Sequence, residues 1–70
     1  MSLYNNDWRK IIKALAKFGF EIARQRGSHI ILKKEGKIIS VPRHSPVLMP
    51  TLRSILAQAG ISEEEFLKRL

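Results

Sequence analysis

The sequence predicts an α+β fold in which one helix precedes a three-stranded antiparallel sheet and further helices follow, all packed on one face of that sheet. Three features lead to this prediction. An amphipathic helical segment lies near the start, three short segments rich in isoleucine and valine are separated by glycine turns, and two helical segments end the chain. The sheet and the helices each have an apolar surface to bury, so they pack together. Residues 1–70 are interpreted as a single domain, since a chain this short buries only about 60% of its surface on folding.

The first predicted helix covers residues 7–18, DWRKIIKALAKF, in which apolar residues recur with helical spacing and share one face. Asn6 is the expected N-cap, and Gly19 is the glycine expected to end the helix. The apolar residues are Trp8, Ile11, Ile12, Leu15 and Phe18. The opposite face carries Arg9, Lys10, Lys13 and Lys17. No acid lies among these cations, so this face either is only solvated or meets phosphates or an acidic protein.

Three strands are predicted at residues 20–26, 29–34 and 37–42. The dipeptides between them, Gly27-Ser28 and Glu35-Gly36, are typical of tight turns, so the strands form an antiparallel meander.

A two-residue turn at Glu35-Gly36 determines which strand residues share a face. Leu32 then lies opposite Ile39 and Ile30 opposite Val41, and these four belong in the core. Placing Ile22 on the same face requires a bulge or a three-residue loop around Gly27. The other face then carries His29, Ile31, Ile38 and Ser40.

Residues 42–50, PRHSPVLMP, are expected to form a loop because they contain three prolines, the last of which suits the first turn of a helix. That helix covers TLRSILAQA and ends at Gly60. The residues expected to face the core are Leu52, Ile55, Leu56 and Ala59. In the last helix, Ser62 and Glu65 form a capping box. The complete order, α-β-β-β-α-α, is the chain order of the double-stranded-RNA-binding domain.

The chain carries 13 lysine and arginine residues against 6 aspartate and glutamate residues, for a formal net charge of +7. This surplus favours a polyanionic partner, and we expect nucleic acid, although an acidic protein or anionic lipid satisfies the same charge. The absence of cysteine excludes a disulfide framework and a thiolate metal site. No segment resembles a signal peptide or a membrane span, so we expect a cytoplasmic protein without membrane contact.

His29, one of two histidines, follows Gly27-Ser28 at the start of a predicted strand. Two imidazoles without a nearby carboxylate are a poor metal site, so no metal or other cofactor is expected. Metal-free RNA cleavage needs less, because the 2′-OH is an internal nucleophile, histidine transfers protons near neutral pH, and cations stabilise the charge on phosphorus. The candidate cations are Arg24, Arg26, Lys33, Lys34 and Arg43. On these residues alone, a simple contact of His29 to RNA or water is favoured over catalysis.

Three strings, LAKFGFEIARQRGSHIIL, ISVPRH and TLRSILAQAGISEEEFL, follow one another over nearly the whole chain after Tyr4. In order and spacing they resemble the HicA family of small toxins, metal-independent messenger-RNA interferases with a double-stranded-RNA-binding-domain-like fold. The resemblance implies that His29 is the catalytic residue, acting as general base or acid, and that Gly27 shapes its loop. His44 falls where the family often has a histidine, either for proton transfer or for phosphate contact. The implied partner is a HicB-type antitoxin that covers His29.

The residues expected to bind RNA come from the first helix, the first strand, the turn before His29, the loop after the third strand and the second helix. They are Lys13, Lys17, Arg24, Arg26, Gly27, Ser28, Arg43, His44 and Arg53. The sequence departs from the family in two places. Ile30 stands where many members have a second histidine, and VLMPTL lacks the basic pair that usually precedes the Thr-Leu of the second helix.

Two other functions remain open on the sequence. One is a non-catalytic RNA-binding module that reads A-form shape. The other is an interaction protein whose open sheet face, with Ile31 and Ile38, binds an acidic protein. The sequence also leaves open whether the free protein is a monomer or a dimer.

Overall fold

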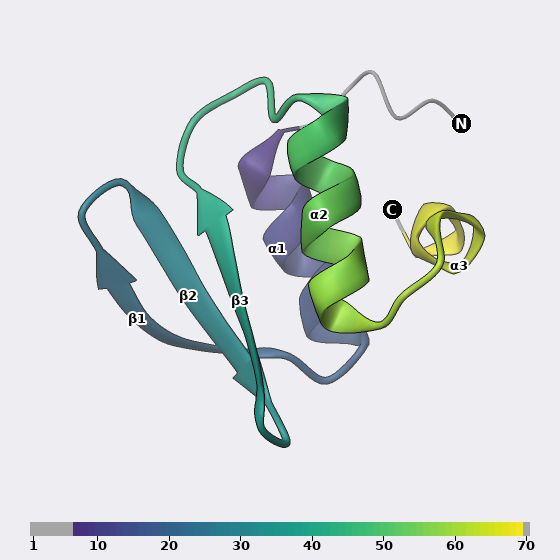
Figure 1. Ribbon diagram of the computed structural model, residues 1–70, viewed down its shortest axis with the longest axis horizontal. Coiled ribbons are helices and arrows are strands. Elements are labelled where there is room, and N and C mark those ends of the chain that lie inside the picture. Colours follow the sequence, from purple (N-terminus) through teal and green to yellow (C-terminus); the bar gives the residue numbers. More distant parts are fainter. Residues whose placement is uncertain (1–6, 70) are drawn as a thin grey trace.

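The computed structural model of the protein describes residues 7–69. Its elements are α1 (Trp8–Lys17), β1 (Glu21–Arg26), β2 (His29–Lys34), β3 (Lys37–Pro42), α2 (Met49–Ala59) and α3 (Glu63–Lys68), in the order shown in Figure 1. The predicted order of helices and strands is therefore confirmed. None of the described helices has the length and hydropathy needed to cross a membrane.

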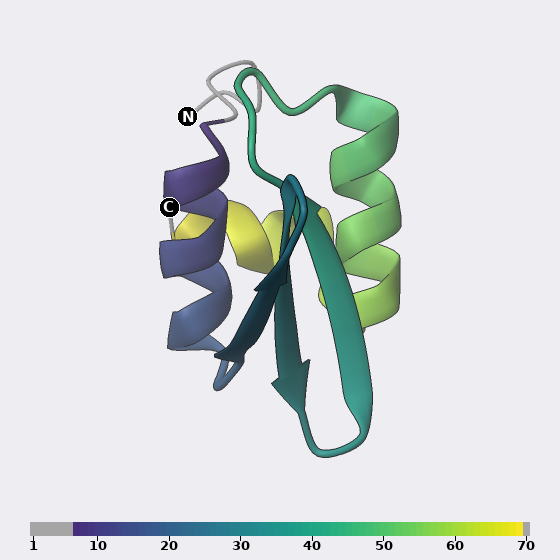
Figure 2. The same cartoon turned by 90° about the vertical axis from the view of Figure 1, so that its left-hand side faces the viewer.

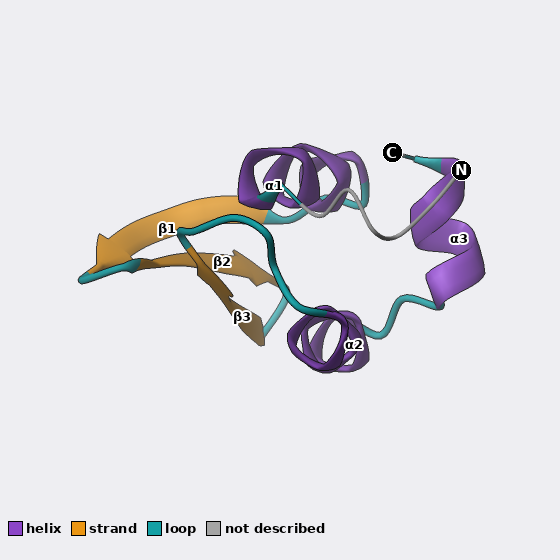
Figure 3. Ribbon diagram, turned by 90° about the horizontal axis from the view of Figure 1, so that it is seen from above, coloured by secondary structure: helices purple, strands orange, loops and turns teal. Residues whose placement is uncertain are grey.

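The helices all lie on one side of the sheet, as predicted. Figure 2 shows the sheet in front, with α1 and α2 behind it on either side and α3 behind them. The view from above in Figure 3 shows the same three levels: the sheet, then α1 and α2, then α3. The fold therefore leaves the opposite side of the sheet open.

The strand order is β1-β2-β3, and both neighbouring pairs are antiparallel. Leu32 pairs with Ile39 and Ile30 with Val41, as predicted, and all four are buried. The connecting turn has φ values of 47° at Glu35 and 85° at Gly36. Positive φ at both central residues is the pattern of the type I′ hairpin turn, which fixes this register.

The irregularity predicted for the first hairpin is present, but it lies within β1 and not around Gly27. Arg26 pairs directly with His29, so Gly27-Ser28 is a two-residue turn, and the irregularity lies between Ile22 and Arg24. Gly27 has a φ of 60°, as the first central residue of a type II′ turn requires, so the hairpin closes without an extra residue. Ile22 lies opposite Leu32 but is 61% exposed, because the helices pack chiefly on β3, at the other edge of the sheet from β1. Ile22 is therefore on the same face as Leu32, as the bulge requires, but it is not part of the buried core.

The core lies between the sheet and the helices. All four predicted α2 positions are buried, and α3 contributes Phe66, which is 1% exposed. Val47 is also 1% exposed, although it lies in the loop predicted for residues 42–50. The buried side chains are Ile11, Ala14, Leu15, Phe20, Ile30, Leu32, Ile39, Val41, Val47, Leu52, Ile55, Leu56, Ala59 and Phe66.

Helix α1 begins at a cap one residue later than predicted. Asp7 is the N-cap, and its Oδ1 accepts the main-chain N–H of Arg9 at 3.1 Å. The expected cap, Asn6, lies outside the described residues. The hydrogen bond from Arg9 and a second one from Ser45 hold the pKa of Asp7 below its ordinary value.

Lysine side chains close the C-terminal ends of the helices. Lys34 Nζ donates to the carbonyl of Phe18 at 2.6 Å, and Lys37 Nζ donates to that of Ala59 at 3.3 Å. Lys17 Nζ donates to the carbonyl of Arg69, the C-cap of α3, at 3.0 Å. An ammonium group at a helix C-terminus satisfies an orphan carbonyl and complements the helix dipole, so these cations stabilise the fold.

Candidate active site

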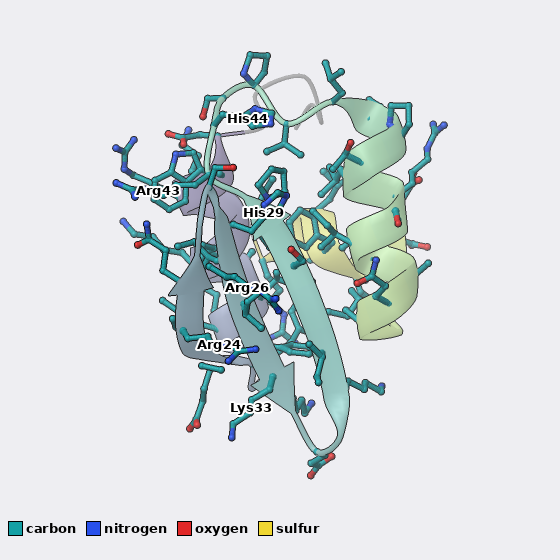
Figure 4. The ribbon with its side chains drawn as sticks, turned by 60° about the vertical axis from the view of Figure 1, so that its left-hand side comes forward. Arg24, Arg26, His29, Lys33, Arg43 and His44 are labelled. Atoms are coloured by element: carbon teal, nitrogen blue, oxygen red, sulfur yellow. The ribbon has the colours of Figure 1, made fainter. Side chains whose placement is uncertain are left out.

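The open side of the sheet, here called the outer face, consists of alternate residues of the three strands. The register places them in rows across the sheet. The first row is Arg26, His29 and Pro42; the second is Arg24, Ile31 and Ser40; the third is Glu21, Lys33 and Ile38. Figure 4 shows Arg26, Arg24 and Lys33 following one another down the sheet from His29.

The turn before β2 brings His29 to the end of the outer face. Gly27 supplies the positive φ that a two-residue turn needs, and a Cβ placed on it would meet no atom within 4 Å. Glycine is therefore required there by backbone conformation and not by crowding. His29 begins β2 and is exposed, and its side chain makes no hydrogen bond to any of residues 7–69. Its ring is thus open to a ligand.

The segment after β3 lies next to this turn. The main-chain N–H of Arg43 donates to the carbonyl of Ser28 at 2.7 Å. This bond makes His29 and Pro42 a non-hydrogen-bonded pair, the kind in which opposite side chains are closest, and it suits Pro42 because proline has no N–H. His44 follows directly, and Figure 4 shows His29 and His44 at the same end of the molecule.

The loop that carries Arg43 and His44 is fastened to the start of α1. Ser45 Oγ donates to Asp7 Oδ1 at 3.1 Å and accepts the main-chain N–H of Trp8 at 3.4 Å. The Arg43 guanidinium lies 5.8 Å from the centroid of the Trp8 ring, which also contacts Arg9 at 4.8 Å. These contacts hold the loop beside the His29 turn.

The cations of the outer face are not used within the described part of the protein. The side chains of Arg24, Arg26 and Lys33 form no hydrogen bond or ion pair with another described residue. Glu21, at the end of the face remote from His29, is the one acidic residue among the described residues of these rows. A phosphodiester beside His29 would therefore meet unpaired positive charge on the sheet.

Other predicted RNA-binding residues lie away from this face. Lys17 points toward α3, where it contacts the Arg69 carbonyl, and Lys13 lies one turn before it on the same side of α1. Arg53 Nε donates to Glu63 Oε1 at 3.0 Å, the one ion pair among residues 7–69. The structure thus brings together the predicted residues of β1, the turn and the 43–44 loop, and separates them from those of α1 and α2.

Sequence reasoning missed the residues that position the loop. Asp7 and Ser45 are 38 positions apart, and no spacing pattern connects them. Trp8 was predicted as an apolar residue of α1, and it does pack against the core, but its contact with Arg43 had no signal in the sequence. Within residues 7–69, no three histidine, aspartate or glutamate side chains are grouped as metal ligands.

One protein family matches most of the chain. The model of the HicA toxins of bacterial toxin–antitoxin systems matches residues 8–61, which run from the first residue of α1 to just beyond α2 and include the whole sheet. The search of curated proteins found no match. The match covers well over half of the chain and includes His29 and the loop that carries His44. This protein belongs to the HicA toxin family.

Proposed function

We propose that this HicA-family toxin is a metal-independent endoribonuclease that cleaves messenger RNA, with His29 as its catalytic residue. The observation that carries the proposal is the position of His29. It is exposed at the end of an open sheet face, its side chain has no hydrogen-bond partner among the described residues, and it lies in the same row as Arg26. Residues 1–70 act as one domain and require no cofactor.

The reaction is an internal transesterification. The 2′-oxygen of one ribose attacks the adjacent phosphorus, the bond from phosphorus to the 5′-oxygen breaks, and a 2′,3′-cyclic phosphate and a 5′-hydroxyl form. His29 accepts the proton of the 2′-OH or gives one to the departing 5′-oxygen. Arg24 and Arg26 stabilise the negative charge that develops on the phosphoryl oxygens.

His44 is the second group proposed to transfer a proton. It lies at the same end of the molecule as His29, on a segment joined to the His29 turn by the bond from Arg43 to Ser28. Two histidines would supply the base and the acid that transesterification requires. If His44 instead contacts phosphate, its removal weakens RNA binding and leaves the rate at saturating RNA unchanged.

The proposed protein partner is a HicB-type antitoxin. A net charge of +7 favours an acidic partner, and the unpaired cations of the outer face give it a surface to bind. Covering that surface would exclude RNA from His29 and silence the toxin without any chemical change. We propose that both proteins act in the cytoplasm, where messenger RNA is translated.

The test is cleavage of a long single-stranded RNA by purified protein in excess EDTA, beside His29→Ala and His44→Ala. We expect wild-type cleavage to persist in chelator, His29→Ala to be inactive, and the fragments to end in cyclic phosphate. Circular dichroism controls for folding, which His29→Ala should not affect because this side chain is exposed. RNA that stays intact with wild type, while still being bound, would instead identify a non-catalytic RNA-binding module.

A further inference from the structure

Two groups of the 13 lysine and arginine residues differ in what their side chains do. Lys17, Lys34 and Lys37 donate to helix C-terminal carbonyls, and Arg53 is paired with Glu63. The unpaired cations on the sheet form the second group and all project from the outer face. They are Arg24, Arg26 and Lys33.

These unpaired cations form a line that starts at His29. Arg24 and Arg26 are alternate residues of β1, so they share a face and their Cα atoms are about 6.6 Å apart. Lys33 is four residues along β2 from His29, at about 13 Å on the same face. Figure 4 shows the three cations descending the sheet from His29. Lys33 borders an open depression that is also lined by Lys34 and by the acids Glu21 and Glu35, so the run of unopposed positive charge ends there.

We propose that the RNA strand runs along the outer face, from His29 past Arg26 and Arg24 to Lys33, and that Lys33 is the distal phosphate contact. This inference rests on the proposed function, because it places the substrate of the same site. It assigns to Lys33 a binding role, and it moves the RNA away from α1 and α2.

The dimensions of the face fit one extended strand. Three strands span two inter-strand spacings, or about 10 Å, too narrow for contact with both backbones of a duplex. The attacking 2′-OH must also lie in line with the departing oxygen, which a flexible single strand permits more readily than an A-form helix. The described rows of the outer face contain no phenylalanine, tyrosine or tryptophan, so phosphate contacts supply most of the affinity.

The helix side is less suited to RNA. Lys17 and Arg53 are already engaged there, although Lys10 and Lys13 of α1 are exposed and form no hydrogen bond with another described residue. The first turn of α3 presents Glu63, Glu64 and Glu65. Three adjacent carboxylates repel a phosphate backbone, whereas the described rows of the outer face have only Glu21, at the far end.

The test measures binding separately from cleavage. A fluorescent single-stranded RNA, 2′-O-methylated throughout so that it cannot be cleaved, is titrated with protein at several salt concentrations. For single strands, the slope of log K against log salt loses about 0.7 for each phosphate contact removed. Lys33→Gln should therefore reduce the magnitude of the slope by about 0.7 and weaken binding several-fold. The matched control, Lys68→Gln, removes an exposed lysine of α3 and should leave both quantities unchanged.

A Lys33→Gln protein with the wild-type slope would overturn the proposed path. If the slope falls in Lys13→Gln instead, the RNA lies over α1. The outcome is independent of the nuclease proposal. If Lys33→Gln reduces the slope but the wild-type protein cleaves no RNA, the nuclease proposal is refuted and the path is retained. If the wild-type protein cleaves RNA but Lys33→Gln leaves the slope unchanged, only the path is refuted.

Discussion

Arg43 donates its main-chain N–H to the carbonyl of Ser28 at 2.7 Å, and this bond joins the turn before His29 to the loop that carries His44. The two histidines, 15 positions apart in the sequence, therefore occupy one end of the fold. The conformation of the Gly27-Ser28 turn and the position of the 43–44 loop are therefore both expected to matter for the site.

Replacing Gly27 tests the turn on one side. Gly27 has a φ of 60°, and a Cβ at this position would have no atom within 4 Å, so Gly27→Ala introduces conformational strain without a steric clash. We expect the free energy of unfolding to fall by about 1–2 kcal/mol in urea denaturation. Ser28→Ala, in the same turn at negative φ, is the control and should unfold like wild type. Equal stability of Gly27→Ala and wild type would contradict the assigned turn.

Removing the Ser45 hydroxyl tests the loop on the other side. Ser45→Ala loses the bonds to Asp7 and to the Trp8 N–H, so Arg43 and His44 become less well positioned. We expect RNA cleavage to slow by about threefold to tenfold, since small errors of position are costly in catalysis. Ser54→Ala, an exposed serine of α2, controls for the loss of a hydroxyl. A Ser45→Ala protein as active as the control would show that the loop needs no such anchor.

Acid should weaken the cap of α1. The pKa of Asp7 is lowered in the folded protein, chiefly by the Arg9 N–H, from an ordinary value of 3.8. Its contribution to stability is therefore complete above pH 3.8 and is lost as the pH falls through the lower folded value. Thermal melts between about pH 5 and pH 2 should show a smaller pH dependence for Asp7→Asn than for wild type. Superimposable profiles would show that the Asp7 carboxylate does not stabilise the helix.

The neighbouring residues Lys33 and Lys34 should separate stability from binding. Lys34 Nζ donates to the Phe18 carbonyl, whereas the Lys33 side chain has no partner among residues 7–69. Lys34→Met should lower the free energy of unfolding by about 1 kcal/mol, since it leaves that carbonyl without its charged donor. Lys33→Met, on the same strand, should unfold in urea at the wild-type midpoint. Equal losses in the two variants would contradict the structural role of Lys34.

Local signals in the sequence were sufficient for most of the fold. The glycine turn at Glu35-Gly36 determined the register that pairs Leu32 with Ile39, and the alternation of side chains then placed His29 on the open face. The helix ends at Gly19 and Gly60 followed from the same local chemistry, and both glycines have positive φ. Each of these features is determined by a few adjacent residues, so it can be predicted from a single sequence.

Features that depend on tertiary placement could not be predicted. Ile22 pairs with Leu32 but is exposed, because no helix covers this part of β1. The pattern of apolar residues does not show which strands the helices cover. The partners of Lys17 and Lys34 are likewise carbonyls in distant parts of the chain. Lys17, expected to bind RNA, and Lys34, one of the candidate cations, are therefore engaged within the fold. The catalytic role of His29 and the RNA contacts remain predictions.

The lysines at the helix ends also affect which residues of such a toxin can diverge in evolution. Lys34 and Lys37, beside the Glu35-Gly36 turn, and Lys17, at the end of α1, hold the helix ends, whereas the cations proposed to bind RNA project from the outer face. Substitutions on the outer face therefore leave the folding free energy largely unaltered. Substrate choice and antitoxin pairing can diverge together on this surface, while the scaffold beneath it stays constant.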